Sequence, residues 1–123
     1  MGRSRSGCTA SRANHPQCSR VVNARCTVRS ARTREWTSPG VVKVVCDAHG
    51  TALYFSRAPI PGRGHGAPAV PARELPARRH IGVYAFRPGT LARCAALPRG
   101  RLEQAESLEQ LRWLEAGERI RVA

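Results

Sequence analysis

A histidine and a tyrosine four residues apart, His80 and Tyr84, form the spacing in this chain that most suggests ligand binding. Residues 80–86 alternate like a β-strand, so positions 80, 82, 84 and 86 would share one face of a sheet. Farther along, Glu109 and Gln110 stand in a stretch that predicts a helix. Polar residues on a strand face and at a helix start are what a polar-ligand pocket in an α/β protein requires.

Each of these residues also has an ordinary structural interpretation. His80 could be a sheet-edge histidine whose hydrogen bonds are satisfied, and Tyr84 a core residue with its hydroxyl at the surface. Glu109 and Gln110 could lie on a solvated helix face. The spacing by itself leaves both interpretations open.

The elements that must position these residues begin near residue 41. Residues 41–46 are a mostly β-branched run that predicts a buried strand, and residues 47–50 have turn chemistry. Residues 52–55 predict the returning strand of a hairpin. Residues 62–77 are rich in Gly, Pro and Ala and predict a long loop, in which His65 would be solvated.

The second half of the chain predicts a strand, helices and a final strand. Residues 80–86 would be the strand and residues 90–97 a short helix, and residues 98–100 would break that helix. An apolar stripe on one helix or two kinked helices is predicted by Leu102, Ala105, Leu108, Leu111 and Leu114. Gly117 is placed for a helix C-cap, and residues 119–122 predict a last strand.

The composition limits the classes of protein. A length of 123 residues suits one small domain or part of a larger one, and the formal net charge is +13. Lys43 is the only lysine, and aromatic residues make up 5% of the chain. Nucleic-acid-binding surfaces usually mix lysine with arginine and have aromatic residues nearby. We therefore attribute the many arginines to a GC-rich coding sequence. The sequence has no apolar run long enough to predict a membrane helix, and no signal peptide is predicted. The five cysteines have no paired spacing, which predicts free thiols in a cytoplasmic protein.

Residues 1–36 differ in composition from residues 37–123, and we treat the two as separate segments. The first holds eight arginines and a single acid, Glu35, without a helical or strand period. Three interpretations stay open: a disordered basic tail, a frameshifted stretch, or a zinc site. The zinc site would use Cys8, His15, Cys18 and Cys26, although their spacing is not the close-paired one of structural zinc sites.

From about residue 39 to residue 123 the chain resembles the bacterial 3-deoxy-manno-octulosonate (KDO) cytidylyltransferases, also called CMP-KDO synthetases. The resemblance rests on Val-Val-Lys-Val-Val at 41–45, Ala-Leu-Tyr-Phe-Ser-Arg at 52–57 with Pro-Ile-Pro at 59–61, and Arg-His-Ile-Gly-Val-Tyr at 79–84. It rests also on Leu-Glu-Gln-Ala-Glu-Ser-Leu-Glu-Gln-Leu-Arg at 102–112. These stretches occur in the family's order, so the chain resembles the C-terminal part of such an enzyme.

The resemblance implies a fold and a reaction. The fold would be part of a Rossmann-like, three-layer α/β nucleotidyltransferase. In the reaction KDO attacks the α-phosphate of CTP, with Mg²⁺ required, to form CMP-KDO and pyrophosphate. The family also implies a cytoplasmic homodimer whose product feeds lipopolysaccharide synthesis, with no membrane or nucleic-acid partner.

Carried over residue by residue, the resemblance makes this chain the sugar side of the site. His80 and Tyr84 match the family's sugar-contacting positions, and Glu109 and Gln110 match polar residues that contact the hydroxyls or carboxylate of KDO. Arg57 would pair with a carboxylate. The resemblance assigns no catalytic residue and no metal ligand to this chain.

The chain departs from the family in the parts that bind nucleotide and metal. The nucleotide-binding loop and the Gly-Asp-Glu-Pro segment have no counterpart, and Asp47, the only aspartate, lies in the predicted turn. We therefore expect a truncated chain that is inactive alone. The alternatives are another sugar-acid cytidylyltransferase, such as a sialic acid enzyme, a basic nucleic-acid-binding protein, or a remnant that cannot hold a fold.

Overall fold

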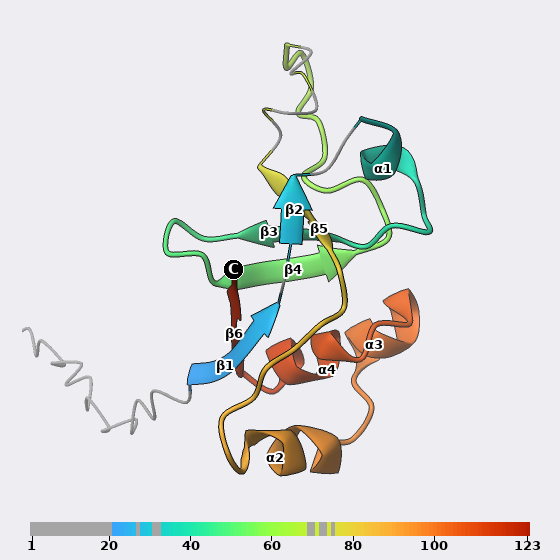
Figure 1. The fold of residues 1–123 in the computed structure, drawn as a ribbon. Helices are drawn as coiled ribbons and strands as arrows, with labels where there is room; N and C mark the ends of the chain where they lie inside the picture. The colour runs from blue at the N-terminus through green and yellow to red at the C-terminus, as the bar shows by residue number, and fades with distance from the viewer. Residues whose placement is uncertain (1–20, 27, 31–32, 69–70, 72–73, 75) are drawn as a thin grey trace, which may run out of the picture.

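The computed structural model describes residues 21–26, 28–30, 33–68, 71, 74 and 76–123, with side chains from residue 34 onward. The strands and helices form a mixed α/β arrangement (Figure 1). The strands are β1 (Val21–Cys26), β2 (Val28–Ser30), β3 (Lys43–Cys46), β4 (Ala52–Ser56), β5 (Ala77–His80) and β6 (Arg119–Val122). The helices are α1 (Thr33–Thr37), α2 (Thr90–Ala96), α3 (Arg101–Glu106) and α4 (Gln110–Glu115).

The larger sheet is antiparallel and has the order β2-β5-β3-β4. Its β3–β4 hairpin closes through Asp47, whose Oδ1 accepts the N–H groups of His49 and Thr51, both at 2.8 Å. Gly50 takes a φ of 77°, a conformation that L side chains rarely adopt. The strand, turn and hairpin predicted over residues 41–55 are confirmed.

The smaller sheet pairs β1 with β6 in parallel. The Val122 N–H donates to Gly50 O at 2.8 Å, and Thr51 forms an antiparallel bridge with Arg121. The hairpin turn is therefore held against the last strand by backbone contacts. This places the end of the chain beside the β3–β4 turn (Figure 1).

The helices α2, α3 and α4 lie together on one side of the larger sheet and close the core (Figure 1). The buried core consists of Val44, Ala52, Phe55, Cys94, Leu108, Leu111, Trp113, Ile120 and Val122. Helix α2 confirms the prediction over residues 90–97, and α3 with α4 confirms the two-helix interpretation of the leucine stripe. Gly117 follows α4 with a φ of 81°, and its N–H donates to Leu114 O at 3.0 Å.

Two sequence predictions were wrong in detail. The strand predicted over residues 80–86 ends at His80, because the ladder stops where His80 N–H donates to Val42 O and Gly82 then takes a φ of 83°. The leucine stripe is buried only in its later part: Leu108 and Leu111 are buried, whereas Leu102 and Ala105 are exposed. Beyond His80, residues 81–87 have no regular secondary structure.

Strands β1 and β2 and all but the last residue of helix α1 lie within residues 1–36, where the sequence showed no such period. Trp36 is buried, and its Nε1–H donates to Ile60 O at 2.9 Å. Arg79 on β5 pairs with Glu35 at 2.7 Å. The boundary at residue 36 stays a prediction, and the zinc ligands proposed at Cys8, His15 and Cys18 lie outside the described residues, as does the Cys26 side chain.

The described part of the chain settles two smaller points. Cys46 and Cys94, the cysteines whose side chains are described, are free thiols, as predicted. Within the same residues, no helix has the length and apolar character needed to cross a membrane.

Candidate functional site

The structure brings His80 and Tyr84 into direct contact. The Tyr84 hydroxyl and His80 Nε2 are 2.7 Å apart, a hydrogen-bonding distance. His80 ends β5, and Tyr84 lies beyond the strand, with Gly82 between them at a φ of 83°. The two side chains therefore contact each other, although Tyr84 lies beyond the end of β5 and shares no strand face with His80.

Aromatic rings hold this pair in place. The His80 ring lies edge-on to Phe55, with 5.1 Å between centroids. Tyr84 and Phe86 both pack edge-on against Trp113 of α4, at 5.2 and 5.4 Å. Such edge-to-face contacts are favourable and orient the rings. The contacts of Trp113 with these rings could not be predicted from the sequence, where its only signal was its place three residues after Gln110.

The electrostatics connect Glu109 to the histidine. Burial lowers the pKa of His80, because it disfavours the charged imidazolium, and the Glu109 carboxylate acts in the opposite direction. His80 is therefore neutral at pH 7, and one of its ring nitrogens is a hydrogen-bond acceptor. Glu109 itself is exposed, so the solvated-face interpretation describes its side chain correctly.

Gln110 is different from its neighbour, because its side chain is only 2% exposed. Within the described residues, its Nε2 has no hydrogen-bond partner. An unpaired buried donor costs on the order of 1–3 kcal/mol, which a bound acceptor would recover. The solvated-face interpretation was therefore wrong for Gln110, and the amide is a candidate ligand donor.

Arg57 directly follows the last residue of β4 and contacts α3. Its Nε donates to Glu106 O at 3.2 Å and one terminal nitrogen donates to Pro39 O at 3.3 Å. Its backbone N–H donates to the Glu106 carboxylate at 3.0 Å, and that carboxylate also accepts from Ser56 Oγ at 2.6 Å. These contacts join Arg57 to the chain's own Glu106, so its assignment to a ligand carboxylate stays a prediction.

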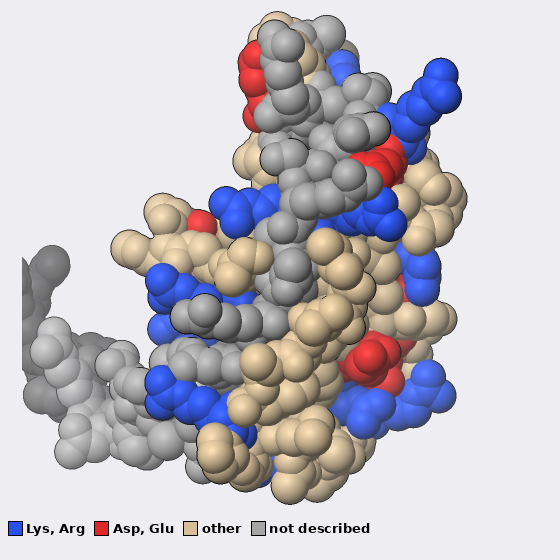
Figure 2. All heavy atoms as spheres, viewed as in Figure 1, with Lys and Arg blue, Asp and Glu red and all other residues tan. Residues whose placement is uncertain are grey.

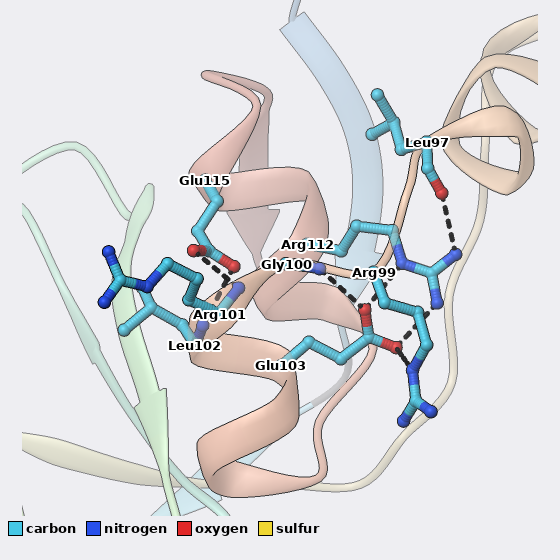
Figure 3. Close-up of polar contacts among 8 residues, drawn as sticks. All are labelled: Leu97, Arg99, Gly100, Arg101, Leu102, Glu103, Arg112 and Glu115. Carbon is cyan, nitrogen blue, oxygen red and sulfur yellow. Dashed lines mark hydrogen bonds and ion pairs between the residues drawn. The ribbon is translucent and has the colours of Figure 1, made fainter.

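A buried ion pair fixes the start of α4, where Glu109 and Gln110 lie (Figure 3). Arg112 donates hydrogen bonds from two nitrogens to the buried Glu103 carboxylate, at 2.7 and 2.6 Å. The same arginine donates to Leu97 O at 3.2 Å, and Gly100 N–H donates to Glu103 at 3.3 Å. A forked pair of this kind restrains both helices.

Glu115 adds a second contact between the same helices (Figure 3). Its carboxylate accepts the N–H groups of Arg101 and Leu102, both at 3.1 Å, which would otherwise be unpaired at the first turn of α3. A side chain at Gly100 would collide with that carboxylate. The sequence pattern showed none of these contacts, because each joins two helices.

Acid should weaken the fold through Glu103. Hydrogen bonds from Arg112 lower the pKa of Glu103 from 4.5 to about 2. The unfolded chain therefore binds this proton more readily, and the stabilisation is present above pH 4.5 and is lost as the pH falls toward 2. We expect urea midpoints of the parent to fall more steeply between pH 5 and pH 3 than those of Glu103→Gln. Equal slopes would contradict this prediction.

The described residues do not offer a cation site. No cluster of three or more His, Cys, Asp or Glu side chains able to hold a metal ion occurs among them. Asp47, the only aspartate of the chain, uses its Oδ1 to accept two turn N–H groups. The described residues therefore do not fit a Mg²⁺ site.

The comparisons with known proteins decide the family. The family model described as Cytidylyltransferase matches residues 13–120. The chain belongs to the cytidylyltransferase family. The family relationship confirms the resemblance predicted from the sequence.

Curated cytidylyltransferases resemble this chain over its later part. A 3-deoxy-manno-octulosonate cytidylyltransferase of Anaeromyxobacter sp. (strain Fw109-5) is 61% identical over 83 residues, which cover 68% of this chain and 32% of the relative. The enzyme of the same name from Xanthomonas campestris pv. campestris (strain 8004) is 57% identical over 89 residues, covering 69% of this chain and 35% of the relative. The chain thus spans about a third of the length of these relatives.

A solved cytidylyltransferase structure has the same fold. It is CMP:2-keto-3-deoxy-manno-octonic acid synthetase complexed with CTP, with a TM-score of 0.66 and 41% identity, covering 84% of this chain and 39% of that one. The predicted nucleotidyltransferase α/β fold class is confirmed. The roles of His80, Tyr84, Glu109, Gln110 and Arg57 stay predictions.

Proposed function

We propose that this chain carries the sugar-acid side of an enzyme that transfers CMP from CTP to KDO and releases pyrophosphate. The observation that carries the proposal is the hydrogen-bonded His80–Tyr84 pair, in a chain that is 61% identical over 83 residues to a curated 3-deoxy-manno-octulosonate cytidylyltransferase. The buried, unpaired Gln110 amide on the neighbouring helix supports it.

These side chains have complementary hydrogen-bonding abilities. KDO bears a carboxylate and several hydroxyls, so its site needs both donors and acceptors. Gln110 Nε2 is a buried donor, Glu109 is an acceptor, and neutral His80 with Tyr84 supplies one of each. The role we assign to the chain is to bind and orient the sugar acid before its hydroxyl attacks CTP.

We propose further that the chain does not catalyse the reaction alone. Its limited coverage of the relatives supports this, as does the lack of a fitting cation site among the described residues. The purified chain, with CTP, KDO and Mg²⁺, should release no pyrophosphate above background. Measurable release would overturn this part of the proposal.

The family resemblance extends the proposal to the whole enzyme. It would be a cytoplasmic, Mg²⁺-dependent homodimer whose product enters lipopolysaccharide synthesis. A substrate panel tests the sugar: KDO should bind more tightly than N-acetylneuraminic acid, and the reverse order would favour a sialic acid enzyme.

Binding of KDO by the chain tests the site directly. Trp113 contacts Tyr84, so we expect KDO to change the tryptophan fluorescence. Gln110→Leu and His80→Ala should each weaken binding by about tenfold or more, since a hydrogen bond to a charged group contributes about 1.5–3 kcal/mol.

The matched control for these variants is His65→Ala, because His65 is an exposed histidine in the long loop. It should bind KDO as the parent does. If the His80 and Gln110 variants bind like the His65 variant, the assignment of the site is wrong.

A further inference from the structure

A pocket lies where the β3–β4 turn meets β6. It has a volume of about 320 Å³ and is lined by His49, Thr51, Arg119 and Arg121. None of these residues belongs to the candidate sugar-acid site. The described lining combines two guanidinium groups, an imidazole and a hydroxyl, and it contains no carboxylate.

The frame of this pocket is fixed by hydrogen bonds. Asp47 accepts the N–H groups of His49 and Thr51, and these two hydrogen bonds restrain the turn. Val122 N–H donates to Gly50 O, and Thr51 bridges Arg121 in the antiparallel sense. The turn and the strand are thus held together before any ligand arrives, which lowers the entropic cost of binding.

The two arginines face the same way along β6. The burial alternates, with Ile120 and Val122 in the core and Arg119 and Arg121 exposed. Residues two apart in a strand lie on one face with α-carbons roughly 7 Å apart. Blue Lys and Arg side chains are visible along both edges of the molecule, including the edge where the β3–β4 turn lies (Figure 2).

Within the described residues, the positive charge in this region is offset only in part, by the Asp47 carboxylate. No ion pair there involves Arg119 or Arg121. Backbone hydrogen bonds, first that from Thr51, lower the pKa of Asp47, and the charges of His49 and Arg119 add to the effect. The carboxylate is therefore an anion at neutral pH, but it is engaged by the turn's own N–H groups.

We propose that this pocket binds the phosphate group of a small molecule. A dianionic phosphate matches two adjacent guanidinium groups, and the planar fork of arginine donates two parallel hydrogen bonds to such an anion. Thr51 and His49 can add donors from the turn side. The proposal does not depend on the proposed function, because no residue of the sugar-acid site takes part.

Titration with inorganic phosphate, followed by amide NMR on the full chain, tests the site. We expect saturable shifts confined to residues 47–51 and 119–122, with an affinity in the millimolar range. Non-saturating shifts, or shifts spread over arginines throughout the chain, would overturn the proposal. So would binding to a DNA duplex that moves these same amides when phosphate does not.

Variants separate a built site from general charge attraction. Arg121→Gln should weaken phosphate binding by about tenfold or more, and Arg119→Lys, which keeps the charge but loses the fork, by less. Arg101→Gln is the matched control, an exposed arginine on α3. If Arg101→Gln weakens binding as much as Arg121→Gln, the proposal is wrong.

The spectrum of each variant reports whether it is folded. KDO binding should be unchanged in Arg121→Gln, so loss of phosphate binding there cannot be attributed to the sugar-acid site. Arg119→Lys retains the strand's charge and serves as the second test if Arg121→Gln disturbs the β6 backbone.

Discussion

Replacing Leu111 with alanine should destabilise the fold by about 2–5 kcal/mol. The Leu111 side chain is 0% exposed and lies in the core cluster with Phe55, Trp113 and Ile120. The loss combines the removed apolar contacts with the cavity that the surrounding side chains cannot fill. Urea unfolding monitored by circular dichroism measures the change.

The matched control is Leu91→Ala on α2. Leu91 is 57% exposed, so the same change of side chain should alter stability by no more than about 0.5 kcal/mol. If the two variants lose equal stability, Leu111 is not in a packed core. Since only the folded chain can hold the site, the Leu111→Ala variant should also weaken KDO binding in proportion to its loss of folded protein.

Replacing Lys43 with methionine should cost about 1–3 kcal/mol, although methionine is apolar and of similar length. The Lys43 side chain is 0% exposed. Its Nζ donates to Ser38 O at 2.9 Å, to Val41 O at 2.7 Å and to Arg57 O. Methionine has no donor for these three carbonyls, and each unpaired, shielded acceptor is unfavourable.

Arg78→Met is the control for the lysine, because Arg78 is an exposed cation on the adjacent strand β5, opposite Val44. It should change the free energy of unfolding by no more than about 0.5 kcal/mol. A Lys43→Met protein as stable as the parent would mean that the three hydrogen bonds contribute nothing net. Burial lowers the pKa of Lys43, against the opposing charge of Glu106.

Local patterns in the sequence predicted several elements correctly. The β-branched run before Asp47 gave strand β3, and the Asp-Ala-His-Gly turn gave the hairpin, because turn chemistry acts within four residues. The breaks at residues 98–100 and at Gly117 marked helix ends for the same reason. The polar pair Glu109–Gln110 was placed correctly at the start of α4.

Errors arose where an element depends on a partner. Residues 80–86 alternate as a strand does, but β3 begins at Lys43, which pairs with Arg79. One more hydrogen bond follows, from His80 N–H to Val42 O, and the chain beyond His80 has no residue of β3 left to pair with. Strands β1 and β2 were not predicted, because their own sequence shows no strand period. They are defined by their pairing with β6 and β5. Strand pairing is non-local, and side-chain alternation alone does not reveal it.

The family, the hairpin, the helices and the candidate site residues could be predicted from the sequence, because motifs and turn signals are local properties of the chain. Packing between distant segments, in contrast, brings His80 into contact with Tyr84 and buries Gln110 while Glu109 stays exposed. It also directs the Lys43 ammonium to three backbone carbonyls. It also placed Arg57 against Glu106 and gathered His49, Arg119 and Arg121 around one pocket. Burial and pairing depend on which distant segments pack together, and a single segment of sequence does not encode that.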